Sequence, residues 1–318
     1  MIEMENENNN KPMISVVMIS YNHQVFIEES LMSVVEQQSD SYDLEILIVD
    51  DGSSDDTQKI ISSVQEKYPD LIFPTFKEHA GITAINKNLN EQIKKARGEY
   101  IAFLAGDDKY LPNRFEKQLE AFKKDDLVEL VISNGKNFDL AREEFLNSCQ
   151  EEVIVRMLQE GNESDVYEYI TTNVPTLLIQ GFLVKKSMLE AIDFFDESVI
   201  ADDWVLNIRI FQYLTEHNKK AMYIEDVVFQ RNIHGENTSR NIDDHSLRIM
   251  QVVDKYISPT KQKHILKKMH LNFFILCVRR KMYQKSLSHF YQYQKNDFFM
   301  RDLFLLITNK IAKKLNAK

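Results

Sequence analysis

The segment YIAFLAGDDKYLPNRFEKQ, residues 100–118, holds the pattern that predicts the fold. An apolar run of strand length, Tyr100 to Ala105, is followed by a glycine and two adjacent carboxylates, Asp107 and Asp108. The amphipathic stretch after Pro112 predicts a helix. One acid could cap that helix, but two neighbouring acids repel each other and are costly to bury without a cation or hydrogen-bond donors. The pair therefore indicates either a helix cap or a metal site at the carboxyl end of a strand.

The same rhythm of strand and helix continues on both sides of this segment. Strand-like runs at 13–20, 44–51, 71–77 and 126–133 alternate with helix-like runs. Such alternation predicts an α/β fold with a mostly parallel central sheet and helices on both faces. Ligands of such sheets bind beyond the carboxyl ends of the strands. The candidate site is therefore made of the polar residues at those ends: Tyr21 and Asn22, Asp50 and Asp51, Asp107 and Asp108.

The pattern also predicts how the chain is organised. We expect a disordered leader at 1–12, an α/β domain at 13–244 and a basic helical extension at 245–318. Within the domain, a second acidic pair, Asp202 and Asp203, precedes an amphipathic helix.

Composition and charge exclude several classes of protein. Two cysteines are too few for a disulfide framework and fit a reducing cytoplasm, and no secretory signal or membrane span is expected. Residues 261–318 carry 14 basic and two acidic side chains, net +12, whereas the rest carries 25 basic and 47 acidic ones, net −22. The acidic body argues against nucleic-acid binding. The basic, aromatic-rich extension predicts contact with an anionic membrane surface; the alternative is a helical pair that packs on the domain or forms a homodimer.

The sequence lacks the motifs that are typical of several other functions. No glycine-rich dinucleotide fingerprint and no P-loop occur. In receiver domains the acidic pair lies on the opening strand of a shorter domain, whereas here it ends the second strand. A sugar nucleotidyltransferase would need a glycine-rich basic loop where this chain has SYNHQVF, residues 20–26. A catalytically inactive nucleotide-sugar-binding or scaffold protein stays open as an alternative.

The ordered series SYN, LEILIVDDGSSDDT and GEYIAFLAGDD, within residues 13–240, closely resembles the family 2 inverting glycosyltransferases of the GT-A fold. The resemblance implies transfer of a sugar from a nucleotide-diphosphate sugar, commonly a UDP-sugar, to a hydroxyl group with inversion. Transmembrane helices and the Q-x-x-R-W motif of processive synthases are not found, so we expect single-residue transfer. Enzymes of this kind typically build capsule or O-antigen units on a glycan or polyprenyl-linked acceptor, as peripheral proteins at the cytoplasmic face of the membrane.

The resemblance also implies how the nucleoside of the donor is held. Tyr21 stacks on the base, and Asn22 shapes the turn that carries it. Asp51 accepts a hydrogen bond from a base N–H, with Asp50 beside it. Asp107 lies near the ribose.

The same resemblance implies the metal and catalytic residues. Asp108 binds Mn²⁺ or Mg²⁺, and His234 lies near the metal and the diphosphate. Asp203 is the catalytic base, with Asp202 as the alternative because helix boundaries shift by a few residues. The chain departs from the family in Ala105, where many members have an acid, and in Asp202, where glutamate is usual. The chemistry agrees with these roles, since a divalent cation neutralises a leaving diphosphate and a helix N-terminus keeps a carboxylate ionised.

Some of these positions also have structural interpretations. His234 by itself would be a solvated loop residue. Trp204 is expected to be either a core residue or part of the wall of the acceptor pocket. Gly181 indicates either a close approach of the acceptor or a bulge in a strand.

Overall fold

The computed structural model describes residues 11–200, 203–234 and 242–279, together with residues 282, 284, 285, 288, 289 and 292. Asp202, most of the leader expected at 1–12 and residues 293–318 of the basic extension lie outside the described residues. The chain divides into two compact units, residues 1–240 and residues 241–318.

Strands and helices alternate through the first unit, as the sequence predicts. Its strands are β1 (Met13–Ser20), β2 (Asp43–Asp50), β3 (Ile72–Phe76), β4 (Tyr100–Ala105), β5 (Lys109–Tyr110), β6 (Val128–Asp139), β7 (Glu144–Ser148), β8 (Phe182–Lys185) and β9 (Lys220–Ile233). Its α-helices are α1 (Ile27–Val35), α2 (Thr57–Lys67), α3 (Ile85–Lys95), α4 (Arg114–Phe122), α5 (Glu152–Gln159), α6 (Glu163–Ile170), α7 (Lys186–Ala191) and α8 (Asp203–Glu216). Two short 3₁₀ helices are η1 (Gly81–Ala84) and η2 (Ile179–Gly181).

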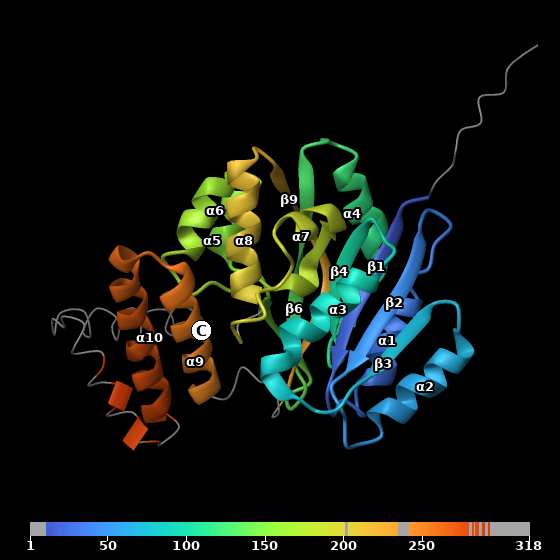
Figure 1. Cartoon of the computed structure of the whole chain (residues 1–318), viewed down its shortest axis with the longest axis horizontal. Coiled ribbons are helices and arrows are strands. Elements are labelled where there is room, and N and C mark those ends of the chain that lie inside the picture. The colour runs from blue at the N-terminus through green and yellow to red at the C-terminus, as the bar shows by residue number, and fades with distance from the viewer. Residues whose placement is uncertain are drawn as a thin grey trace, which may run out of the picture. The chain divides into compact units, whose positions relative to one another are not determined.

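The described strands form one mixed sheet in the order β3-β2-β1-β4-β8-β6-β9-β5, with β7 paired to β6. Strands β3, β2, β1 and β4 are parallel neighbours, whereas β8 runs antiparallel between β4 and β6. In Figure 1 the four parallel strands lie side by side, with α3 in front of them and α1 behind. The expected α/β sheet with helices on both faces is therefore confirmed, and the antiparallel β8 makes its second half mixed.

Burial along β1 explains why this strand is central. Val16, Val17 and Met18 are consecutive and fully buried. Successive side chains of a strand point to opposite faces, so both faces of the sheet must be covered here. Helix α1 covers one face with Ile27 and Leu31, which are also fully buried and lie one turn apart. Apolar residues without alternation are what a sheet covered on both faces requires.

The order of the strands reverses at β1, which fixes the place of the site. The chain moves outward from β1 to β2 and β3, and then returns to the other side of β1 as β4. In the register, Ser20 lies opposite Asp50 and Ile19 opposite Ala105, so the three carboxyl ends are level. A crevice outside the carboxyl ends at such a reversal is where ligands of open α/β sheets bind.

The second unit contains α9 (Ile242–Tyr256) and α10 (Pro259–Arg279). Apolar side chains of both helices are buried, among them Val252, Val253, Ile265 and Met269. Among the residues described, no helix has the length and apolar character needed to cross a bilayer.

Candidate functional site

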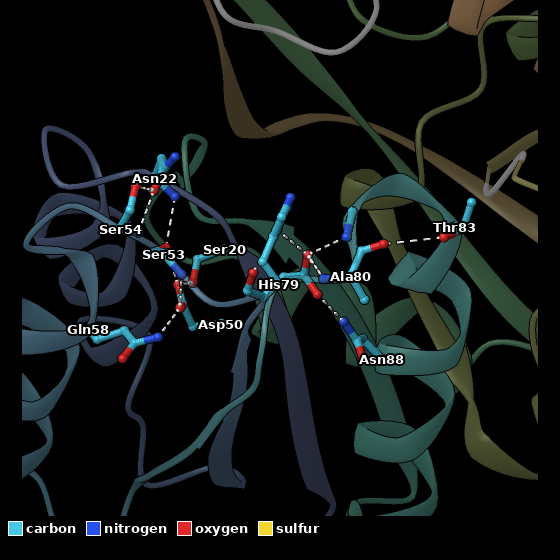
Figure 2. Close-up of polar contacts among 12 residues, drawn as sticks. Ser20, Asn22, Asp50, Ser53, Ser54, Gln58, His79, Ala80, Thr83 and Asn88 are labelled. Atoms are coloured by element: carbon cyan, nitrogen blue, oxygen red, sulfur yellow. Dashed lines mark hydrogen bonds and ion pairs between the residues drawn. The ribbon is translucent and has the colours of Figure 1, made fainter.

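Asp50, the last residue of β2, organises the turn that follows it. Its fully buried carboxylate accepts hydrogen bonds from Ser20 Oγ at 2.8 Å, from Ser53 N and Oγ at 2.8 and 2.6 Å, and from Gln58 Nε2 at 2.7 Å. Figure 2 shows these partners arranged around Asp50. Because the carboxylate is committed to protein donors, Asp50 supports the site rather than offering a group to a ligand.

Asn22 joins the turn after β1 to the turn after β2. Its φ of 54° lies in the left-handed region, which asparagine tolerates better than most residues. Its backbone N–H donates to Ser53 Oγ at 2.8 Å, and its side-chain Oδ1 accepts from the Ser54 N–H at 2.9 Å. The two turns are thereby held as one loop cluster.

Asp51 faces the opposite way from Asp50, toward η1 and α3. Its Oδ2 accepts from the backbone N–H groups of Gly81 and Ala80, at 2.9 and 3.3 Å, and its Oδ1 accepts from Asn88 Nδ2 at 3.1 Å. Lys77 Nζ donates to Asn88 Oδ1 at 2.9 Å, which turns the amide NH₂ toward Asp51. The carboxylate is thus fixed in direction, and its Oδ2 also lies 3.0 Å from His79 Nδ1.

Tyr21 stacks on His79, whose Nδ1 contacts the Asp51 carboxylate. The ring centroids are 4.1 Å apart at an angle of 15°, and Tyr21 is 39% exposed. The sequence pattern does not predict a role for His79. It lies just beyond β3, so the carboxyl end of the third strand was the signal that could have found it.

Asp107 and His234 form a second cluster, at the carboxyl end of β4. His234 Nε2 donates to Asp107 Oδ2 at 3.0 Å, and each side chain is 13% exposed. Burial alone would raise the pKa of Asp107, but the hydrogen bond from His234 and the charges of His23 and His234 bring this pKa below its ordinary value. His23 lies beside the pair, and its buried Nδ1 has no hydrogen-bond partner among the described residues. An added Cβ at Gly106 would come within 2.8 Å of that atom.

Asp108 points away from this pair, into the protein. Its buried carboxylate accepts from the Asn232 backbone N–H at 2.9 Å and from Gln180 Nε2 at 3.1 Å. Burial and the neighbouring charge of Asp107 raise the pKa of Asp108 well above its ordinary value. The fully buried Arg114 holds Gln180 in place by donating to its carbonyl oxygen at 2.6 Å. The carboxylate of Asp108 is thus enclosed by protein donors, whereas that of Asp107 faces His234.

Close packing explains why residue 181 is a glycine. A Cβ at this position would lie 2.3 Å from the Ser133 carbonyl oxygen and 2.7 Å from Gln150 Nε2. The close approach of η2 to β6 therefore requires glycine, and it brings Gln180 within reach of Asp108.

Asp203 is the first described residue of α8, and the structure places it at the N-terminal end of that helix. Trp204 beside it is a core residue, since it is buried and its Nε1 donates to the Ile170 carbonyl oxygen at 2.8 Å. Asn207 donates to the Leu177 carbonyl oxygen at 2.8 Å. These contacts anchor the first turns of α8 and so fix the position from which Asp203 extends.

The donor set at Asp107 and His234 fits a divalent cation. A carboxylate oxygen and an imidazole nitrogen are ligands that Mn²⁺ accepts, and Mg²⁺ sites use one or two carboxylates together with substrate phosphates. No group of three or more His, Cys, Asp or Glu that could hold a metal occurs in the described part of the chain. The pair therefore suits an ion whose remaining ligands come from a diphosphate and water.

The sequence model of "Glycosyl transferase family 2" matches residues 15–192, more than half of the chain. The chain belongs to glycosyl transferase family 2. It is 32% identical over 155 residues to an uncharacterized glycosyltransferase of Nostoc sp., covering 47% of this chain and 46% of that protein. It is 38% identical over 110 residues to the putative teichuronic acid biosynthesis glycosyltransferase TuaG of Bacillus subtilis, covering 35% of this chain and 42% of TuaG. The matches thus span less than half of each of these relatives.

Solved structures of glycosyltransferases share the fold of this family 2 chain. Residues 1–349 of S. aureus TarS in complex with UDP-GlcNAc superpose with a TM-score of 0.57 at 19% identity, covering 87% of this chain and 79% of that one. The mannosyltransferase PcManGT of Pyrobaculum calidifontis, in complex with GDP-Man and Mn²⁺, gives a TM-score of 0.55 at 17% identity, covering 96% and 81%. At these identities the likeness shows the fold alone, and it confirms the GT-A prediction.

Proposed function

We propose that this family 2 glycosyltransferase transfers a single sugar, with inversion, from a nucleotide-diphosphate sugar to a hydroxyl group of a glycan or lipid-linked acceptor. The observation that carries the proposal is the pairing of two clusters at one edge of the sheet. Asp51 lies beside an exposed tyrosine at the ends of β1 and β2, and Asp107 lies beside His234 at the end of β4. A nucleoside diphosphate needs an aromatic ring and a hydrogen-bond acceptor for its planar base. It also needs cation ligands for its charged diphosphate.

The nucleoside is proposed to bind at Tyr21 and Asp51. A half-exposed tyrosine ring offers a stacking face, and the fixed Asp51 carboxylate accepts a further N–H. Uracil, thymine and guanine carry a ring N–H, whereas neutral cytosine and adenine do not. The site is therefore suited to UDP-, dTDP- or GDP-sugars, of which we favour a UDP-sugar.

The diphosphate is proposed to bind at Asp107 and His234, which would hold Mn²⁺ or Mg²⁺. The bound cation would supply charge neutralisation to the leaving nucleoside diphosphate. In the free protein His234 sets the direction of the Asp107 carboxylate through its hydrogen bond, and the cation would take the place of the shared proton. Asp108 is proposed to support the site from the protein interior, through its hydrogen bonds with Asn232 and Gln180.

Asp203 is proposed to take the proton from the acceptor hydroxyl as that oxygen attacks the sugar. A carboxylate in the first turn of a helix is stabilised as the anion by the free N–H groups and the helix dipole. Inversion requires such a base on the face of the sugar opposite the leaving group.

Nucleotide binding tests this proposal. With Mn²⁺ present, calorimetry should detect UDP binding, and CDP should bind about 10- to 100-fold more weakly because Asp51 would then meet an acceptor instead of a donor. Asp51→Asn should weaken UDP binding by a similar factor. Asp56→Asn is the matched control, since the Asp56 side chain is exposed and its carboxylate pairs with Lys59 at 2.6 Å. Failure of UDP, dTDP and GDP to bind at millimolar concentration would overturn the proposal.

Turnover then separates the enzyme from a catalytically inactive binding or scaffold protein. The enzyme should release free sugar slowly from its donor, or transfer it to an acceptor. A protein that binds the donor tightly and never consumes it would match the scaffold alternative.

We further propose that the product is a bacterial surface polysaccharide, of the capsule or O-antigen type, made at the cytoplasmic membrane face. The relative TuaG, described as a putative teichuronic acid biosynthesis enzyme, supports a polysaccharide product. The net charge of +12 over residues 261–318 supports attachment to an anionic leaflet.

Co-sedimentation of the full chain with vesicles checks the attachment. The protein should pellet with phosphatidylglycerol-containing vesicles at low salt and should be released as ionic strength rises, because exposed charges are screened beyond about 10 Å at 0.1 M salt. Neutral vesicles are the control. Equal recovery from both kinds of vesicle at low salt would contradict an electrostatic attachment.

A further inference from the structure

His79 and Tyr21 form a stacked pair at the edge of the proposed nucleoside site. Their rings are nearly parallel, with an interplanar angle of 15° and a centroid distance of 4.1 Å. The side chain of His79 is 46% exposed. An aromatic pair that is this open to water stays together with little help from burial, so a competing ring can separate it.

His79 also contacts Asp51, the residue that is proposed to accept a hydrogen bond from the base. Its Nδ1 lies 3.0 Å from the Asp51 carboxylate Oδ2 and 3.0 Å from the Asp51 carbonyl oxygen. Both partners are acceptors, so Nδ1 must carry a proton. A planar ring that stacks on Tyr21 and presents a ring N–H to Asp51 is also the description of a bound uracil.

The backbone beneath His79 is fixed, whereas its side chain faces water. Gly52 has a φ of +72°, and a Cβ added there would lie 2.4 Å from the His79 backbone nitrogen, so the two turns are in close contact. The neighbouring N–H groups of Ala80 and Gly81 are held by Asp51. Movement of His79 can therefore be a rotation of the side chain alone, which is fast and needs no change of the backbone.

We infer that His79 occupies the place of the nucleobase in the free protein, and that the donor must displace it from Tyr21 and Asp51 in order to bind. This inference rests on the proposed function, because it takes Tyr21 and Asp51 as the base site. It makes His79 an internal competitor that lowers donor affinity. It also keeps the Asp51 carboxylate paired when no donor is present.

The test compares His79→Ala with His217→Ala. His217 is a matched control, since it stacks on Tyr213 with centroids 4.2 Å apart and its Nδ1 lies 3.0 Å from the Tyr213 carbonyl oxygen, at the far end of α8. Calorimetry with uridine and with UDP plus Mn²⁺ measures the affinity of each variant. His79→Ala should bind both ligands about two- to tenfold more tightly than the unmodified protein, the factor that one aromatic stack contributes. His217→Ala should bind as the unmodified protein does.

A second measurement follows the ring itself. In a ¹³C-histidine-labelled full chain, the His79 ring protons should carry an upfield shift from the Tyr21 ring, and His79→Ala identifies the signal. Saturation with UDP should abolish that shift. The variant His79→Phe keeps a ring over Tyr21 but donates nothing to Asp51, so its affinity for uridine should lie between those of the unmodified protein and His79→Ala.

The outcomes separate this inference from the proposed function. If UDP binds but His79→Ala leaves its affinity unchanged or weakens it, or if the His79 shift persists at saturation, His79 is not a competitor and the inference is overturned alone. If no nucleotide binds to the unmodified protein or to His79→Ala, the proposed function and the inference both fail.

Discussion

Asp203→Asn is expected to lower the rate of sugar transfer by about 10²- to 10⁴-fold while donor affinity stays close to that of the unmodified protein. The amide keeps the shape of the side chain but cannot accept the proton of the acceptor hydroxyl. Because the proposed base acts on the acceptor, removing it should leave the nucleoside and diphosphate contacts intact. A transfer assay measures the first effect, and calorimetry with donor and Mn²⁺ measures the second.

The matched control for this variant is Glu216→Gln, at the other end of α8. Glu216 is exposed and accepts a hydrogen bond from Gln212 at 2.9 Å, so its loss should leave transfer unchanged. A collapse of donor affinity in Asp203→Asn would place Asp203 in the donor site instead. Transfer at the normal rate would mean that another group, such as Asp202, is the base.

Asp107→Asn is expected to reduce metal-dependent transfer by about 10²-fold or more, since charge neutralisation by a bound cation is worth several kcal/mol and each 1.4 kcal/mol is a factor of ten. The remaining activity should need much more Mn²⁺ for half-saturation, because one of the two proposed ligands has lost its charge. Activity measured over a Mn²⁺ titration, with EDTA as the zero point, gives both quantities.

Asp108→Asn is the comparison that makes this assignment falsifiable. Its new NH₂ group would face either the Asn232 N–H or the Gln180 NH₂, and each of these is a donor. We expect a loss of about 1–3 kcal/mol in the free energy of unfolding, with a nearly normal Mn²⁺ requirement in the protein that stays folded. If Asp108→Asn raised the Mn²⁺ requirement and Asp107→Asn did not, Asp108 would be the ligand, as the family resemblance alone implies.

The sequence by itself determined the fold and the edge of the sheet that carries the site. Short unbroken apolar runs that alternate with amphipathic ones specify buried strands and covering helices, and this needs only local periodicity. The fully buried run Val16 to Met18 is an example. The polar residues that follow these runs could likewise be placed at one edge, because parallel strands all end on the same side.

Only the tertiary structure decided what each acid does. Asp50 and Asp51 are neighbours in sequence, yet Asp50 is enclosed by its own turn while Asp51 faces η1 and α3. Asp107 and Asp108 diverge in the same way, one toward His234 and the other toward Gln180 and Asn232. Side chains of adjacent residues leave the backbone in different directions, so two neighbouring aspartates can lie in different environments.

The tertiary structure also decided which distant segments of the chain come into contact. His79 lies 28 residues from Asp51, and His234 lies 127 residues from Asp107, yet both form hydrogen bonds to these acids. No local pattern encodes such pairs, because they arise when the strands assemble in the order β3-β2-β1-β4 and β9 joins the same sheet. Periodicity in the chain fixes the elements, whereas the packing of the assembled sheet decides which partners surround each carboxylate.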